Sequence, residues 1–268
     1  MAEETSRTRR WTVRSDPRFA VRTAGVWDTV SELLQAQAQR AGRDTLDVVD
    51  VGGGTGGFAV PVAGLGHRVT VVDPSPDALA SLSRRAQDAG VSDLVRAEQG
   101  DAAGLPELLG RECADVVLCH GVLEYADDPH AALAGVVAAL RGDGVASLLV
   151  AQRLGAVLAN ALAGRFAQAR RLLDDPAGRG GEADPLPRRF DEASLAALLA
   201  PHGAAISDVH GVRLVTDLLP GALLDGDPAA LDDLLALERA VAEHPTLSAV
   251  CAQLHVLVVP SRGAASGR

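Results

Sequence analysis

The chain has 268 residues, of which 47% are hydrophobic and 22% are charged. That balance excludes an intrinsically disordered protein and predicts a globular fold with a sizeable core. No apolar run reaches the ~18 residues that a membrane-spanning helix needs, and residues 1–17 lack the apolar stretch of a signal peptide. Cys113, Cys119 and Cys251 form no CxxC pair, which disfavours a disulfide framework or a zinc site. We therefore expect a cytoplasmic protein without a metal.

All 25 basic residues are arginines, and they face 35 acidic residues for a formal net charge of −10. A chain this acidic disfavours nonspecific binding to nucleic acid, which requires neutralisation of phosphates. Arginines nevertheless concentrate in two segments, residues 7–22 and 165–189. These segments are either a solvated tail and helix face, or two parts of a local basic patch.

Strand-like and helix-like segments alternate over the first 151 residues. Apolar positions at helical spacing predict a helix over 26–41, and short apolar runs predict strands. The expected strands are 45–51, 68–72, 94–99, 114–119 and 144–151. The expected helices are one that follows a glycine-rich segment and ends at residue 65, one over 76–89, and one over 129–140 that Gly142 closes. This alternation predicts an α/β fold of right-handed βαβ units, with a parallel sheet covered on both faces.

The alternation breaks after residue 151. Residues 152–190 are expected to form an insertion, with one helix from Gly155 to Leu173 and a loop rich in Gly, Pro and Asp after it. The expected elements that follow are a helix over 193–200, a strand over 205–215, a helix over 228–242 and a strand over 254–259. The chain therefore divides into an N-terminal arm and helix (1–43), a main domain (44–260) and a disordered tail (261–268).

A glycine-rich segment, Asp50-Val51-Gly52-Gly53-Gly54-Thr55-Gly56, follows the first predicted strand. Glycines there let the backbone approach a ligand, and the next helix offers free N–H groups. The segment also satisfies the dinucleotide pattern G-x-G-x-x-G, so a dinucleotide and S-adenosylmethionine compete as the ligand. The carboxylate of Asp50 would repel a pyrophosphate but suits the ammonium group of S-adenosylmethionine.

Two more acidic residues follow the next two strands. Asp73 ends the second strand, where it could accept hydrogen bonds from both ribose hydroxyls of either cofactor. Gly100, Asp101 and Ala102 follow the third strand, where a carboxylate can meet the adenine amino group. The alternative role of Asp101 is an ordinary helix N-cap.

Taken in this order, the motifs resemble those of class I S-adenosylmethionine-dependent methyltransferases. The resemblance covers roughly residues 44–151 and rests on Asp50-x-Gly52-x-Gly54-x-Gly56, Asp73, Gly100-Asp101 and the segment from Asp115 to His120. It implies a Rossmann-like, seven-stranded, mostly parallel sheet with an antiparallel last strand and helices on both faces. It also implies S-adenosyl-L-methionine as the cofactor.

A closer resemblance links the chain to the CmoM family, which methylates the carboxyl group of 5-carboxymethoxyuridine at the tRNA wobble position. It rests on the segments His120–Pro129, Asn160–Phe166, Gly211–Asp217 and Leu254–Val256. The resemblance implies that the 1–43 segment covers the cofactor site. It also implies cofactor contacts from Arg22, Gly52, Gly53, Asp73, residues 100–102 and His120.

Methyl transfer to a carboxylate needs no general base, because a carboxylic acid is already ionised at pH 7. The site needs a donor pair that orients the carboxylate, as an arginine does. Arg213 is the first candidate, since it lies in an apolar, strand-like segment where a charge is otherwise costly; the alternative is a structural ion pair with Asp217. His120 lies just beyond the fourth strand, where we interpret it as a positioning or cofactor-contacting residue, with a structural loop histidine as the alternative.

Three functions follow in order of preference. The first is a tRNA-modifying carboxyl methyltransferase, and the second is a methyltransferase that acts on a small metabolite. The third is a non-catalytic partner subunit with the methyltransferase fold, against which the intact glycine segment and Asp73 argue. Which molecule accepts the methyl group and which oligomer forms are not decided by these residues.

Overall fold

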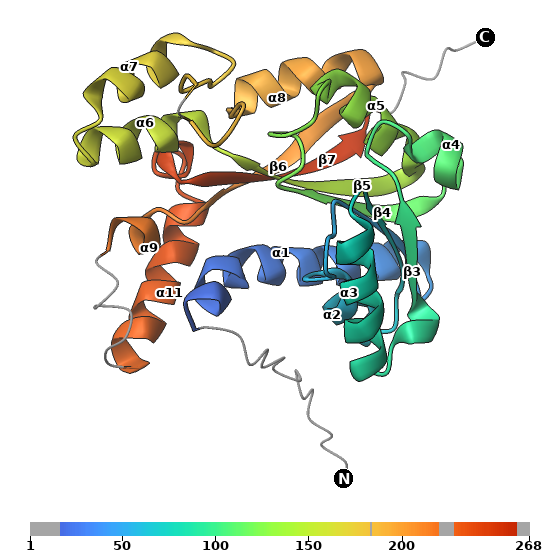
Figure 1. The fold of residues 1–268 in the computed structure, drawn as a ribbon. Helices are drawn as coiled ribbons and strands as arrows, with labels where there is room; N and C mark the ends of the chain where they lie inside the picture. The colour runs from blue at the N-terminus through green and yellow to red at the C-terminus, as the bar shows by residue number, and fades with distance from the viewer. Residues whose placement is uncertain (1–16, 183, 220–227, 262–268) are drawn as a thin grey trace.

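The computed structural model describes residues 17–182, 184–219 and 228–261. One central sheet runs through the molecule, with helices on both faces (Figure 1). Its seven strands are β1 (Asp47–Val51), β2 (Arg68–Asp73), β3 (Val95–Gln99), β4 (Ala114–His120), β5 (Leu140–Ala151), β6 (Ala204–Val212) and β7 (Gln253–Pro260). Their order across the sheet is β3-β2-β1-β4-β5-β7-β6.

Strand β7 runs antiparallel to both of its neighbours, and the other six strands share one direction. The predicted mostly parallel, Rossmann-like sheet with an antiparallel last strand is therefore confirmed. Because six strands share a direction, their carboxyl ends meet at one edge of the sheet. Ligands of open α/β sheets bind at that edge.

Ten helices appear in the described part of the chain. They are α1 (Pro17–Ala41), α2 (Ala59–Gly64), α3 (Pro76–Asp88), α4 (Leu105–Leu109), α5 (Pro129–Ala139), α6 (Arg153–Leu162), α7 (Phe166–Asp174), α8 (Glu192–Leu199), α9 (Val215–Leu218) and α11 (Pro228–Ala242). Short 3₁₀ turns add Ser92–Leu94, Ala200–His202 and Ser248–Val250. Within the described ranges, none of the helices is both long and apolar enough to cross a membrane.

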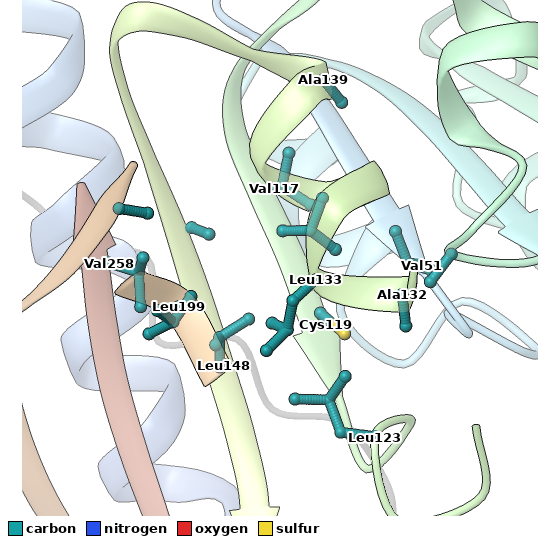
Figure 2. Packing of buried hydrophobic residues seen from close by; sticks show 14 of the residues in the cluster. Val51, Val117, Cys119, Leu123, Ala132, Leu133, Ala139, Leu148, Leu199 and Val258 are labelled. Atoms are coloured by element: carbon teal, nitrogen blue, oxygen red, sulfur yellow. The ribbon is translucent and has the colours of Figure 1, made fainter. Parts of the chain in front are cut away.

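Two apolar layers hold the helices on the sheet. Figure 2 shows Ala132, Leu133 and Ala139 of α5 packed beside Val117 and Cys119 of β4. Helix α8 adds to this layer, and helices α1, α2 and α3 build the layer on the opposite face. Since side chains of a strand alternate between faces, the nearly unbroken apolar run of β4 supplies both layers.

The insertion differs from its predicted form. The single helix expected from Gly155 to Leu173 is wrong, because the chain forms α6 and α7 with a turn between them. Gly164 adopts a φ of 74°, in the left-handed region that favours glycine. Beside it, the Arg165 Nε donates a hydrogen bond of 2.7 Å to the Asn160 Oδ1. A helix cannot continue through a residue in that conformation, so the chain reverses there.

Other boundaries differ as well. Helix α5 ends at Ala139, one residue before its predicted end, because β5 already begins at Leu140 rather than at residue 144. Gly142 therefore lies within β5 and does not close the helix. The first helix begins at Pro17, nine residues earlier than expected. The strand expected to reach residue 215 ends at Val212. The tail expected over 261–268 lies outside the described residues after Ser261.

Candidate active site

The glycine segment forms a loop that lies over the ends of β1 and β2. The Gly52 N–H donates to the Val72 carbonyl at 2.7 Å, and the Gly54 N–H donates to the Asp73 Oδ2 at 2.9 Å. Gly54 has a φ of 55°, a conformation that residues with a Cβ rarely adopt. The loop is therefore tied to β2 at two points.

Gly53 lies directly over the Asp50 carboxyl group. A Cβ atom at residue 53 would lie 2.5 Å from the Asp50 Oδ2 and 3.0 Å from the Val71 Cγ1. A glycine is required there because no side chain fits above the carboxyl group. This close approach brings the backbone of the loop down onto an acidic group.

Asp50 is buried, and its Oδ2 has no hydrogen-bond partner among the described residues. Burial raises the pKa of Asp50 to about 7, the charge of Asp73 adds to the rise, and a backbone bond from Ala59 opposes it. A buried carboxyl oxygen without a partner is costly, so a cation that approaches through the loop would be stabilised. The ammonium end of S-adenosylmethionine is such a cation.

Asp73 also accepts a hydrogen bond on its other oxygen. The Ser75 N–H donates to Oδ1 at 2.8 Å, so each carboxylate oxygen of Asp73 accepts one backbone bond. Each oxygen can accept a second bond, because a carboxylate offers about four lone-pair sites. Asp73 can therefore hold the glycine loop and still accept the two ribose hydroxyls predicted for it.

The segment after β3 gives Asp101 a local role, but the N-cap of α4 is Gly104 and not Asp101. Its side chain is exposed, and its Oδ1 accepts the Gly104 N–H at 2.9 Å just before α4. Gly100 is tied to β2 by an N–H bond to the Asp73 carbonyl at 3.3 Å, and Ala102 is buried. The predicted contacts of these three residues with adenine remain predictions.

His120 lies at the end of β4 with its ring on the α1 side of the sheet. The ring lies edge-on to Phe58, with centroids 4.8 Å apart, and its Nε2 lies 2.8 Å from the Ser147 Oγ. Burial lowers the pKa of His120 to about 4, so the imidazole is neutral at physiological pH. A neutral ring fits a positioning role, which stays a prediction.

Glu124 ties the loop after β4 to the end of β5, a role that the sequence does not predict. Its Oε1 accepts the Ala151 N–H at 2.6 Å. The side chain is buried, and burial raises its pKa. The N-cap of the following helix α5 is Asp128 and not Glu124. The acidic residue between Leu123 and Tyr125 was the available signal in the sequence.

Arg213 lies immediately after β6, not within a strand. It has a φ of 60°, a strained conformation for a residue with a side chain. Its guanidinium lies 3.6 Å from the Asp217 carboxylate, the predicted ion-pair alternative, while its buried Nε has no partner within the described chain. The side chain of Arg213 therefore keeps donors free.

A cavity of about 190 Å³ lies beside Arg213, between α1, β6, α9 and α11. His210 and His255 line its wall together with Arg213. Arg239 of α11 and Asp28 of α1 also line the cavity and form an ion pair at 3.0 Å. Glu238 also lines the cavity, where its two oxygens accept the N–H groups of residues 214 and 216. The cavity lies at the carboxyl end of β6, the edge of the sheet that carries the glycine loop.

Two predicted features are only partly visible. Arg22 lies in α1, but its side chain is outside the described set. Residues 7–16 of the arginine segment 7–22 lie outside the described residues. Among the described residues, no group of three or more His, Cys, Asp or Glu side chains is arranged to hold a metal ion.

Half of the six arginines in the 165–189 segment form ion pairs within the described chain. Three of them bind a nearby acid: Arg170 binds Asp174 at 3.4 Å, Arg179 binds Asp175 at 2.7 Å and Arg189 binds Asp184 at 2.5 Å. For Arg165, Arg171 and Arg188, the described residues supply no acidic partner. Half of the positive charge in this segment is thus neutralised locally.

Comparison with known proteins agrees with this geometry. Residues 49–148 match a family model described as a methyltransferase domain. The chain is 30% identical over 219 residues to the tRNA 5-carboxymethoxyuridine methyltransferase of Escherichia coli (strain K12), covering 82% of this chain and 79% of that relative.

Two solved structures share the fold. Magnesium protoporphyrin IX methyltransferase (ChlM) from Synechocystis PCC 6803, with bound SAH, has a TM-score of 0.58 at 17% identity, over 90% of this chain and 86% of that one. A S-adenosylmethionine dependent methyltransferase from Mesorhizobium loti has a TM-score of 0.54 at 19% identity, over 85% and 95% of the two chains. At these identities the likeness concerns the fold.

Replacement of Asp73 tests the cofactor site. Asp73→Ala should weaken S-adenosylmethionine binding by about 2–4 kcal/mol, because the ribose hydroxyls and the Gly54 N–H lose their acceptor. Calorimetry on a folded variant measures the change. Asp77→Ala, in the exposed first turn of α3, is the control and should bind normally. An unchanged dissociation constant for Asp73→Ala would refute the assignment.

Asp50 predicts a pH-dependent affinity. If the ammonium group pairs with the ionised carboxylate as predicted, S-adenosylmethionine should bind more weakly as the pH falls from about 8 to about 6 through the raised pKa. Asp50→Asn should bind weakly with a flat pH profile.

The same pKa shift fixes the sign for stability without cofactor. A carboxyl whose folded pKa is raised favours folding when protonated, and this stabilisation is lost as the pH rises from about 4 to about 7. Asp50→Asn should therefore unfold at a higher temperature than the wild type at about pH 8. Unfolding temperatures that depend on pH in the same way in both proteins would contradict the raised pKa of Asp50.

Proposed function

Because the chain belongs to the family of S-adenosylmethionine-dependent methyltransferases that includes the tRNA 5-carboxymethoxyuridine methyltransferase of Escherichia coli, we propose that it methylates the carboxyl group of 5-carboxymethoxyuridine at the tRNA wobble position. The observation that carries this proposal is the 30% identity, which extends over 219 residues, 82% of the chain, and so reaches beyond residues 49–148 into the insertion. The insertion lies outside the part that the methyltransferase domain model matches.

The proposed reaction requires no general acid or base from the protein. S-adenosylmethionine supplies a methyl group already activated on a sulfonium. A carboxylate oxygen of the acceptor forms the bond to that methyl carbon as the carbon–sulfur bond breaks, and no proton moves. The chain has to align the two groups within roughly 3–3.5 Å and exclude water. A neutral His120 is consistent with this requirement, since no base is needed.

Arg213 is the group that we assign to the acceptor carboxylate. It lines the cavity at the carboxyl edge, and its only acid within reach among described residues, Asp217, lies at a loose 3.6 Å. An arginine with free donors can bind a carboxylate through two parallel hydrogen bonds. The strained backbone at this residue supports a functional role, because strain of that kind concentrates at binding sites.

A small metabolite with a carboxyl group is the second candidate acceptor. The net charge of −10 favours it, as does the local pairing of three arginines in the 165–189 segment. The cavity chemistry is the same for both acceptors. The two acceptors differ in whether the protein also binds phosphate groups of the acceptor outside the cavity.

Arg213 can be tested by methyl transfer. The enzyme is incubated with methyl-labelled S-adenosylmethionine and either bulk tRNA, free 5-carboxymethoxyuridine or a small-molecule extract. In the fraction that takes up label, Arg213→Gln should lower kcat/KM by about 10- to 100-fold, because a charge-assisted bond is lost. Arg213→Lys should recover part of the activity, and Arg96→Gln, on the distant strand β3, should keep it. Full activity of Arg213→Gln would refute its role.

Salt dependence distinguishes the two acceptors. Binding of tRNA should weaken by roughly 0.7–0.9 log units per log unit of salt for each phosphate contact. Arg165→Gln, Arg171→Gln and Arg188→Gln combined should flatten that slope and leave S-adenosylmethionine affinity unchanged. Arg170→Gln with Arg179→Gln removes two arginines that are already paired, so this control should change the slope less. Equal methylation of free nucleoside and tRNA, without a salt effect, would favour the metabolite.

A further inference from the structure

A row of three buried polar side chains, which we call the polar chain, runs from His120 across the two neighbouring strands of the sheet. The His120 Nε2 lies 2.8 Å from the Ser147 Oγ, and the same Oγ lies 2.7 Å from the His255 Nε2. The three residues come from β4, β5 and β7, which are neighbours in the sheet. The two imidazole rings meet edge-on, with centroids 5.7 Å apart.

The polar chain is unexpected in a close-packed core. Ser147 and His255 have no exposed surface, and their neighbours in sequence are the buried apolar residues Ala146, Leu148, Leu254 and Val256. Burying polar groups is neutral at best unless every group is paired. The polar chain therefore needs an explanation beyond packing.

The single hydroxyl proton of Ser147 restricts how the two hydrogen bonds of the polar chain can be oriented. A serine hydroxyl has one proton to donate, and the described residues place no other acceptor against it besides the two imidazole nitrogens. The hydroxyl therefore donates to one Nε2 and accepts from the other. Both rings are neutral, since burial lowers the pKa of each. It follows that His120 and His255 hold opposite tautomers.

The outer nitrogens of the two rings point away from this chain. The Nδ1 atoms of His120 and His255 are both buried and lack a hydrogen-bond partner within the described chain. His120 packs against Phe58, which directly follows the glycine loop, while His255 lines the cavity beside Arg213. One end of the chain thus faces the cofactor side, and the other end faces the cavity.

We propose that Ser147 and His255 are positioning residues for methyl transfer, which hold the His120 ring in one neutral tautomer beside the cofactor and place His255 in the wall where the acceptor enters. Among the described aromatic rings, the His120 ring is otherwise in edge-on contact with Phe58 and His255, and neither contact fixes a tautomer. This inference rests on the methyl-transfer activity of the family and is independent of which acceptor is used.

The experiment measures tautomers directly. Nitrogen-15 NMR of histidine-labelled enzyme, loaded with S-adenosylhomocysteine, distinguishes the two neutral forms of each ring. His120→Gln and His255→Gln identify the signals. The wild type should show opposite, fixed tautomers for the two residues. Ser147→Ala should release at least one ring to a mixture of tautomers and weaken S-adenosylmethionine binding by about three- to tenfold.

Two further variants keep the test sharp. Ser147→Thr restores the hydroxyl and should restore both the fixed tautomers and the affinity, which a merely space-filling role would not predict. Ser207→Ala removes an exposed hydroxyl of the same sheet, which donates to the Leu257 carbonyl, and should change neither.

Two results would overturn the proposal: identical tautomers for His120 and His255 in the wild type, or unchanged affinity and tautomers in Ser147→Ala. The wild-type spectrum decides even if a variant fails to fold. Because both readouts use only the cofactor and its product, a wrong acceptor in the function proposed above would leave them unaffected.

Discussion

The bond from the Gly54 N–H to the Asp73 carboxylate is the constraint on which the rest of the site depends. It fixes the glycine loop of β1 to the end of β2, and the same side chain holds the turn into α3 through the Ser75 N–H. The loop can take this path because residues 52–54 carry no side chains. Asp73 thus fixes both the glycine loop and the turn into α3, beside which we predict that the cofactor binds.

The electrostatics of that floor select the kind of ligand. Asp50 and Asp73 lie close enough under the loop for the charge of Asp73 to raise the cost of ionising Asp50, and the Oδ2 of Asp50 lacks a partner within the described chain. A pyrophosphate placed on this loop would meet two carboxyl groups. A ligand with an ammonium group and two ribose hydroxyls satisfies both acids, which is why the loop suits S-adenosylmethionine rather than a dinucleotide.

Many of the arginines are neutralised by ion pairs away from the glycine loop. At the amino edge of the sheet, Asp115 is buried and pairs with Arg43 and Arg141, while Asp47 binds Arg68 and Arg141. These contacts join β1, β2, β4 and β5 at the end opposite to the glycine loop. In the insertion, Arg189 is buried against Asp184. A count of arginines therefore overstates the positive charge that a partner such as RNA can meet.

The sequence by itself determined the sheet, the glycine loop and the order of acids along its edge. Those features depend on short-range patterns, such as apolar runs, turn residues and an acid directly after a strand, which stay legible without a fold. Only the tertiary structure decided that Gly164 breaks the insertion helix, that Arg213 leaves its strand in a strained conformation, and which arginines are neutralised. It alone joined Ser147 to His120 and His255, which lie 27 and 108 residues away along the chain. The reason is physical: a single serine or histidine inside an apolar strand has no local partner, so its role is set by whichever strand the topology places beside it.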